Sequence, residues 1–167
     1  MRAARRQMAG MQDPIQPSDP PDPAAWRVLS DLLGRHNAPH AGPSDFRPLV
    51  LLLHDRDGAI EGGLWGRTLY GWLAVLLLVV PEARRGRGLG TALLRRAEAE
   101  AVARGCVGAT LDTFSFQARP FYERLGYVCF AELPGFPPGH ALYMMRKPLG
   151  LTASSVGPTP QAGERDA

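Results

Sequence analysis

The stretch LAVLLLVVPEARRGRGLGT, residues 73–91, decides how the rest of the chain is arranged. An apolar run ends at Pro81, a short loop of arginines and alternate glycines follows, and an amphipathic helical pattern begins at once. At the start of a helix the backbone N–H groups are unpaired, and the helix dipole favours negative charge. Glycines let an anion approach the backbone, and arginines add charge and forked donors. This order predicts a site for a phosphate-bearing ligand at the turn.

The composition is typical of one soluble globular domain. The 167 residues are 45% hydrophobic and 21% charged, and the net charge is only +3. Arginine supplies nearly all of the basic residues, since Lys147 is the only lysine. Residues 1–23 are rich in proline and residues 151–167 in glycine, proline, serine and threonine. We therefore expect a domain over 24–150 between two disordered tails.

Several classes of protein are excluded by what the sequence lacks. The basic start is not followed by the apolar segment of a secretory signal, and the apolar run 72–80 is too short to span a bilayer. Cys106 and Cys129 match no metal-binding spacing and suit a reducing compartment. Basic and aromatic residues form no nucleic-acid platform. We expect a cytoplasmic protein without metal, membrane or nucleic-acid partners.

Apolar periodicity predicts an α/β (α+β) fold with a mixed central sheet. The apolar run 73–80 predicts a central strand covered on both faces. In the helix that follows, Leu94 and Ala97 are expected to be buried and Glu98 to face water. The predicted elements are a helix over 24–36, a loop over 37–44, strands over 49–54, 59–69 and 73–80, a helix over 89–104, a strand over 106–112, a short helix within 116–126, and strands over 127–133 and 141–147.

The glycine-rich loop fits one phosphate-binding pattern and fails two others. A dinucleotide fingerprint from Gly86 would need glycine at Thr91, and an NTPase loop would need a Gly-Lys pair that the chain lacks. The pattern that fits is R-x-x-G-x-G, formed by Arg85, Gly88 and Gly90. An exposed basic turn is the alternative on spacing alone.

Two signatures together resemble the GNAT superfamily of acyl-CoA-dependent N-acetyltransferases. The first is a strand ending in a V-x-P-type run followed by R-x-x-G-x-G/A; here it comprises Val79, Val80, Pro81 and residues 85–91. The second is the helix A-x-x-F-Y-E-x-L-G-F/Y, about thirty residues downstream; here it comprises Ala118, Phe121, Tyr122, Glu123, Leu125, Gly126 and Tyr127. A subgroup with further matches at 62–68, 111–118 and 137–140 is closer still.

The resemblance implies how acetyl-CoA would bind. The central strand would splay from its neighbour and carry a bulge, and one N–H near Val79 would bond the thioester oxygen. The pantetheine arm would lie along the strand, and the loop amides would hold the pyrophosphate. The residues expected to bind acetyl-CoA are Leu78, Val79, Val80, Arg84, Arg85, Gly86, Arg87, Gly88, Leu89, Gly90 and Thr91.

The resemblance also assigns Tyr122 as the general acid that protonates the leaving thiolate. A phenol has a reference pKa of about 10 and a thiol one of about 8.5, so the transfer is uphill unless the site tunes it. Without the motif, Tyr122 would be an ordinary half-buried helix tyrosine.

The general base is not assigned, because the strand 73–80 has no carboxylate. Glu61, Asp112 and His140 are candidates, and each has a plainer alternative: a solvated carboxylate, a turn cap and a surface histidine. A partly deprotonated substrate would need no base. Further candidates for contact with the acceptor are Asn37, Thr113 and Gln117.

The resemblance predicts transfer of an acetyl group from acetyl-CoA to a primary amine, and the absence of an extra recognition domain favours a small-molecule acceptor. Two alternatives stay open: a non-catalytic acyl-CoA-binding sensor or scaffold, and an acetyltransferase that acts on protein amines. Dimers are common in the family, so a homodimer is possible.

Overall fold

The computed structural model describes residue 15 and residues 17–150, which form parts of two compact units, Met1–Pro43 and Ser44–Ala167. The predicted domain 24–150 therefore spans parts of both units. The predicted tail 151–167 and all but a few residues of the tail 1–23 lie outside the described residues. No helix in the described part of the chain is both long and apolar enough to cross a bilayer.

The first unit contains the helix α1 (Ala25–Ala41), which is longer than predicted. Asn37, expected in a loop, lies inside this helix. Pro39 is tolerated because it sits in the last turn, where its missing N–H removes a single helical hydrogen bond. The helix ends at Gly42, which has a φ of 70° and donates its N–H to the carbonyl of Ala38 at 3.0 Å.

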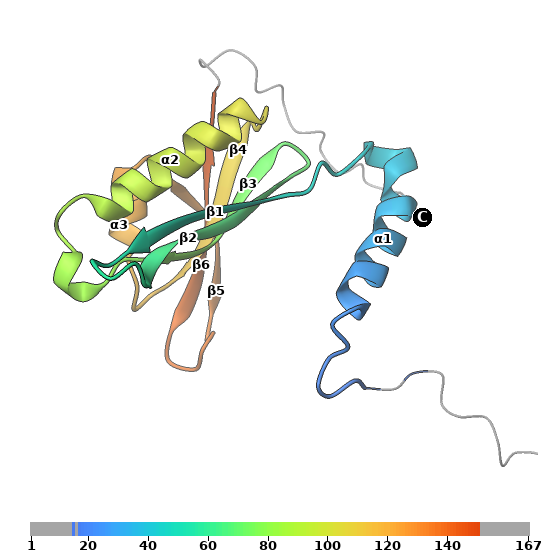
Figure 1. Ribbon diagram of the computed structural model, residues 1–167, viewed down its shortest axis with the longest axis horizontal. Coiled ribbons are helices and arrows are strands. Elements are labelled where there is room, and N and C mark those ends of the chain that lie inside the picture. Colours follow the sequence, from blue (N-terminus) through green and yellow to red (C-terminus); the bar gives the residue numbers. More distant parts are fainter. Residues whose placement is uncertain (1–14, 16, 151–167) are drawn as a thin grey trace, which may run out of the picture. The chain divides into compact units, whose positions relative to one another are not determined.

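The described residues of the second unit form a six-stranded mixed sheet in the order β1-β2-β3-β4-β6-β5 (Figure 1). β1, β2 and β3 form an antiparallel meander, β3 and β4 are parallel across a helical crossover, and β6 pairs antiparallel with β4 and β5. This confirms the predicted fold class. The elements are β1 (Arg47–His54), β2 (Ile60–Leu69), β3 (Trp72–Val79), the short 3-10 helix η1 (Glu82–Arg84), α2 (Leu89–Ala103), β4 (Gly108–Phe114), α3 (Arg119–Arg124), β5 (Val128–Pro134) and β6 (Ala141–Pro148).

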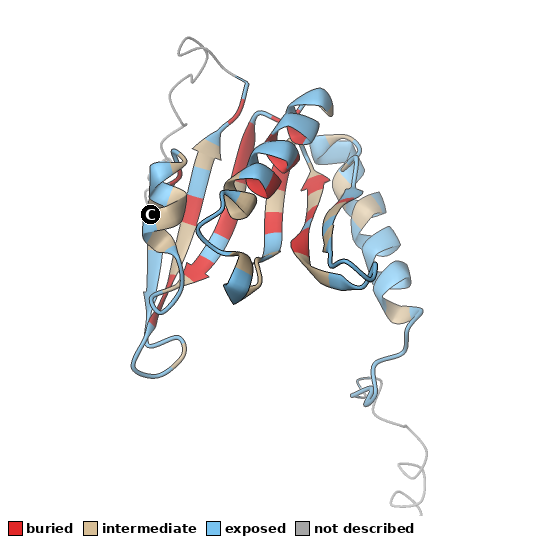
Figure 2. Ribbon diagram, turned by 60° about the vertical axis from the view of Figure 1, so that its left-hand side comes forward, coloured by how far each residue is buried: buried red, intermediate tan, exposed pale blue. Residues whose placement is uncertain are grey.

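The core of this unit lies between the sheet and α2, where the buried positions face each other (Figure 2). Leu94 and Ala97 are buried as predicted, but the prediction for Glu98 is wrong. Its carboxylate accepts a hydrogen bond from Nζ of Lys147 at 2.7 Å, and both side chains are largely shielded from water. The periodicity could not show this, because the partner lies on β6, 49 residues away.

The central strand β3 is covered on one face only within this unit. Leu73 and Val75 are buried in the core. On the other face Leu77 is 62% exposed and Val79 is 52% exposed, which differs from the prediction of a strand covered on both sides. The apolar residues that made the strand look fully buried instead line a cavity.

Candidate active site

The parallel strands β3 and β4 separate part-way along their length. Their pairing runs from Trp72 with Gly108 to Val75 with Leu111 and then ends, although both strands continue. A β-bulge in the pairing of β2 with β3 leaves Leu76 as the extra residue. The predicted splay and bulge are therefore present, with the bulge three residues before Val79. Beyond Val75, the β4-facing edge of β3 has no partner strand among the described residues.

The separated strands open into a cavity of about 1090 Å³. Its walls come from β3, the glycine-rich loop, the first turn of α2, the end of β4 and α3. Residues from each of the sequence motifs line it, including Val79, Val80, Arg85, Gly88, Thr91 and Tyr122. The fold thus brings the loop and the short downstream helix to one site.

The loop fits a phosphate group. Gly86 and Gly88 have φ angles of 75° and 77°, a conformation that other residues adopt at a cost, and open space surrounds both. Gly88 is the N-cap of α2, and no side chain caps the amides of its first turn. A Cβ at Gly90 would lie 3.3 Å from the Phe121 ring. Glycine at this position therefore lets the start of α2 pack closely against Phe121 of α3. These amides and the helix dipole are available to an anion.

The three loop arginines differ in their contacts. Arg85 donates from Nε to the carbonyl of Val80 at 3.1 Å, which turns the side chain along the cavity that it lines. Arg84 also lines the cavity but forms an ion pair with Glu61. Arg87 is exposed and outside the cavity lining. Arg85 is therefore the arginine best placed for a ligand phosphate.

The ion pair with Arg84 places Glu61 beside the glycine-rich loop. Arg84 also donates from Nη1 to the carbonyl of His54 at 3.3 Å, so it ties β1 and β2 to the loop. Glu61 does not line the cavity. Its carboxylate neutralises and positions an arginine here, rather than facing the point where the strands separate.

Tyr122 lies on α3 against the core and lines the cavity. Its ring centroid is 5.0 Å from that of Phe121 and 6.1 Å from that of Tyr127, both in edge-to-face arrangement. Burial raises the pKa of Tyr122 above its ordinary value. The phenol is therefore protonated at neutral pH and is a weaker acid than in water.

The other polar candidates gather where β4 ends. Asp112 and Thr113 line the cavity, Asp112 exposed and Thr113 buried. Gln117 lines it too, but its Oε1 accepts the backbone N–H of Phe114 at 2.9 Å and lies 3.4 Å from the Thr113 hydroxyl. Gln117 thus fastens the loop that follows β4 and is partly occupied by that role.

His140 lies near the cavity without lining it. Its Nδ1 is 3.3 Å from the Ser115 hydroxyl, which also accepts the backbone N–H of Ala141 at 3.2 Å. Its ring packs edge-to-face on Phe116 with a centroid separation of 4.9 Å. Asn37 belongs to α1 in the first unit.

Sequence reasoning missed the apolar lining of the cavity. Phe114 and Phe116 stand two residues apart after the strand, a spacing that puts both rings on one side, and this signal was present in the sequence. Phe136 could not be found that way, because it comes from the loop between β5 and β6. The additional lining residues are Val75, Leu76, Leu77, Leu111, Phe114, Phe116, Ala118, Phe121, Arg124, Phe136 and Leu142. No group of histidine, cysteine and acidic side chains among the described residues could hold a metal ion.

Comparison with known proteins identifies the family. The acetyltransferase (GNAT) family profile matches residues 14–127. The chain belongs to this family. A GNAT enzyme of this kind is an acetyltransferase, and named relatives agree: an acetyltransferase from Agrobacterium fabrum is 40% identical over 130 residues, covering 78% of this chain and 95% of the relative. The blasticidin-S acetyltransferase of Streptomyces morookaense is 44% identical over 93 residues, covering 55% and 68%.

Solved structures of GNAT proteins share the fold described above. A crystal structure of an Agrobacterium tumefaciens protein assigned as an acetyltransferase superimposes with a TM-score of 0.74 at 37% identity, covering 83% of this chain and all of that one. This GNAT chain therefore combines the family's sequence signatures with the family's sheet.

Proposed function

We propose that this protein transfers the acetyl group of acetyl-CoA to the primary amine of a small-molecule acceptor. One observation carries the proposal: a single cavity joins the free amides at the start of α2 to the unpaired edge of β3 and to Tyr122. With a volume of about 1090 Å³, the cavity can take a coenzyme arm together with a small acceptor. A relative named for acetylation of blasticidin S supports an acceptor of this size.

Residues 86–91, with Arg85, would hold the pyrophosphate of the coenzyme through backbone N–H groups and the guanidinium. The apolar side chains of β3 that line the cavity would contact the pantetheine arm. Acetyl-CoA supplies a thioester whose carbonyl carbon can accept an amine nitrogen, which gives an amide and a free thiol. The open edge of β3 from Leu76 to Val79 offers N–H donors for the oxygen on which negative charge develops.

Tyr122 would donate a hydrogen bond to the sulfur as the carbon–sulfur bond breaks. Its raised pKa keeps the hydroxyl protonated at neutral pH but makes complete proton transfer to a thiolate more uphill than the reference values of about 10 and 8.5 imply. We therefore assign to Tyr122 a hydrogen bond that stabilises the leaving sulfur. Transfer of the proton to the sulfur would follow cleavage of the carbon–sulfur bond.

For the acceptor amine, Asp112 and His140 offer complementary functions. Asp112 is the carboxylate that lines the cavity, so it can attract a protonated amine. His140, held by Ser115 beside the cavity, offers an imidazole nitrogen as a proton acceptor. Glu61 is less suited, because it is paired with Arg84.

A panel of amines incubated with the protein and acetyl-CoA tests the proposal, with release of free thiol as the readout. The panel contains small primary amines of different shape and a set of peptides with free N-termini or lysines. We expect release with small amines. Release with peptides alone would favour a protein acceptor, and tight CoA binding without release on any amine would favour a sensor.

A further inference from the structure

The acceptor end of the cavity is built from aromatic rings. Phe114 and Phe116 stack with ring centroids 5.2 Å apart and planes 5° from parallel. Phe136, from the loop between β5 and β6, meets Phe114 edge-to-face at 5.7 Å. His140 meets Phe116 in the same manner at 4.9 Å. The four rings come from two segments of the chain and form one cluster, which we call the aromatic cluster.

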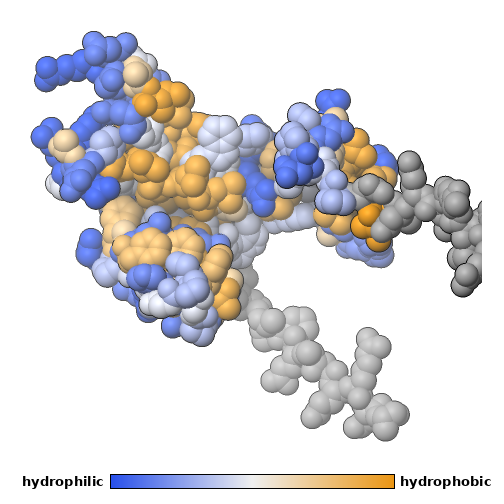
Figure 3. Space-filling model, turned by 90° about the horizontal axis from the view of Figure 1, so that it is seen from below, coloured by the Kyte–Doolittle hydropathy of each residue, from blue (hydrophilic) through white to orange (hydrophobic). Residues whose placement is uncertain are grey.

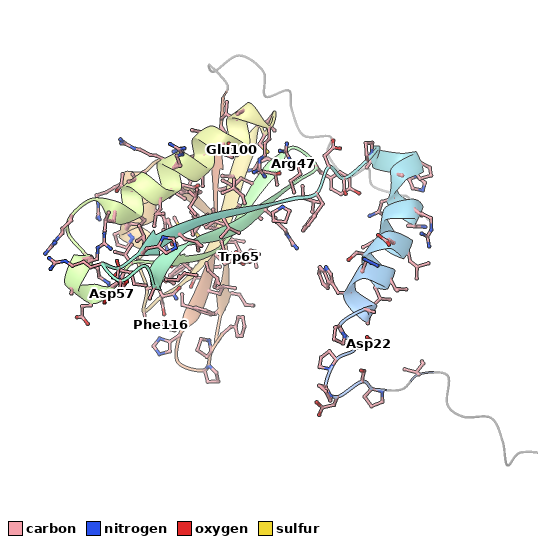
Figure 4. The ribbon with its side chains drawn as sticks, in the orientation of Figure 1. Asp22, Arg47, Asp57, Trp65, Glu100 and Phe116 are labelled. Carbon is pink, nitrogen blue, oxygen red and sulfur yellow. The ribbon has the colours of Figure 1, made fainter. Side chains whose placement is uncertain are left out.

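The aromatic cluster lies on the open side of the sheet. Along β4, Leu111 and Thr113 are buried whereas Asp112 is exposed, so by strand alternation Phe114 shares the face of Asp112. Figure 3 shows apolar side chains gathered on the side of this unit seen from below, from which the β5–β6 loop projects. Figure 4 places Phe116 near that hairpin. The aromatic cluster thus comes from the end of β4 and the β5–β6 loop, and not from the glycine-rich loop.

Two of these rings are only half covered by the protein. Phe116 is 57% exposed and Phe136 is 49% exposed, yet both line the cavity. Contacts with Phe114 and His140 hold them in place, so little side-chain freedom is left for a ligand to remove. A flat ring of a ligand could pack on this preorganised, half-exposed aromatic surface inside the cavity.

The charges of the cavity exclude a polycationic acceptor. Asp112 is the one carboxylate among the lining residues of the described chain, whereas Arg84, Arg85 and Arg124 also line it. A polyamine needs several carboxylates to replace its water of hydration. A single amine fits Asp112, and the rest of such an acceptor must match an apolar, aromatic wall.

We propose that the acceptor is a monoamine with a flat aromatic ring, and that this ring binds to the exposed surfaces of Phe116 and Phe136. The inference rests on the proposed amine acetylation and adds the chemical class of the acceptor. The aromatic cluster orients the ring so that the amine reaches the separated ends of β3 and β4. Aromatic pairs contribute beyond the burial of apolar area, which distinguishes this acceptor from a saturated one of equal size.

The test compares 2-phenylethylamine with 2-cyclohexylethylamine, which have similar volume and the same amine. We expect kcat/KM with the phenyl amine to be about 10-fold higher. The variants Phe116→Leu and Phe136→Leu keep an apolar side chain but remove a ring. Each should lower the preference to about 2-fold while KM for acetyl-CoA stays within about 2-fold of wild type.

Phe130→Leu is the matched control, because Phe130 is 52% exposed on β5 but does not line the cavity. It should keep the full preference. Equal kcat/KM for the two amines, or an unchanged preference in both Leu variants that melt like wild type, would overturn the inference while leaving amine acetylation intact.

Binding without turnover gives a second readout. Saturation-transfer NMR of each amine with the CoA-bound protein should show stronger transfer to the phenyl amine, lost in Phe116→Leu. Absence of thiol release together with this pattern would refute the proposed function and retain the aromatic site. Equal saturation transfer to the two amines would refute the aromatic site, whether or not the protein turns either amine over.

Discussion

Tyr122 shows how one side chain depends on its surroundings for its role. Its ring is packed between Phe121 and Tyr127, and the side chain lines the cavity. Burial raises its pKa, which preserves the proton that a donor needs. The same burial makes the proton harder to release, so the side chain suits a hydrogen bond to sulfur better than early proton transfer.

The first prediction concerns the variant Tyr122→Phe. Loss of the donor should lower kcat by about 100-fold, at the lower end of general-acid effects, with the Kd of acetyl-CoA nearly unchanged. The rate of thiol release gives kcat, and isothermal titration calorimetry gives the Kd of acetyl-CoA. Tyr143→Phe, which removes a phenol outside the cavity lining, is the control. Lost affinity with normal kcat would contradict the assigned role.

The pH profile follows from the same pKa direction. Tyr122 must be protonated to donate a hydrogen bond, and its pKa is raised above the reference value of about 10. Deprotonation of Tyr122 should therefore lower kcat only above about pH 10. Between pH 7 and 9.5, ionisation of Tyr122 should therefore not lower the kcat of the wild type. A fall in kcat over this range that is present in the wild type and absent from Tyr122→Phe would contradict this.

Tyr127 gives a prediction about stability. It is 1% exposed, and burial together with the neighbouring Glu98 carboxylate raises its pKa. A raised folded pKa means that its stabilising contribution is complete below the unfolded value of about 10 and is lost as the pH rises above it. At pH 11 the unfolded state gains about 1.4 kcal/mol from ionising this phenol. Tyr127→Phe should therefore reduce the fall in unfolding free energy between pH 7 and pH 11 by about that amount, measured by urea titration; an identical fall in both proteins would disprove it.

At the scale of elements, the glycine-rich loop and α2 act together. The loop reaches the helix through a glycine in the left-handed conformation, and the uncapped first turn directs its amides into the cavity. The strand–loop–helix order predicted this from the sequence, because the signals are local: an apolar run, glycines and a helical period.

The variant Gly88→Glu tests this element. A carboxylate at the start of α2 would repel a bound pyrophosphate and occupy its space, so affinity for acetyl-CoA should fall at least about 100-fold. Gly105→Glu is the matched control, because Gly105 also has a positive φ and open surroundings but lies at the other end of α2. Calorimetric titration should give wild-type affinity for the control. Equal losses in both variants would show that backbone strain, and not the phosphate site, was responsible.

Element boundaries were less predictable where a tertiary or capping contact decides them. α1 runs past Asn37 to Ala41 because Gly42, and not Pro39, ends it. Glu98 looked like a solvent-facing residue of an amphipathic helix, yet it is buried and its carboxylate is paired with Lys147 of β6. Neither outcome is encoded in the periodicity of the segment itself.

At the scale of the whole molecule, acetyl-CoA should stabilise the folded protein. Ligand at 100 times its Kd adds about 2.7 kcal/mol to the unfolding free energy when it binds only the folded state. The wild type should therefore melt several degrees higher with acetyl-CoA, and Gly88→Glu should show no shift. An equal rise in both proteins would place the ligand elsewhere.

The sequence by itself determined the family signatures, the elements of the sheet and the glycine-rich loop, because these depend on residues close together in the chain. Only the tertiary structure decided that the pairing of β3 with β4 ends at Val75, that Glu61 is bound by Arg84, and that Phe114, Phe116 and Phe136 meet in one cavity. Strand pairing and loop packing join residues that are distant in the chain, and the free energy of such contacts appears only once the sheet is assembled. The glycine-rich loop of the site is thus local and predictable, whereas the aromatic cluster is a product of the fold.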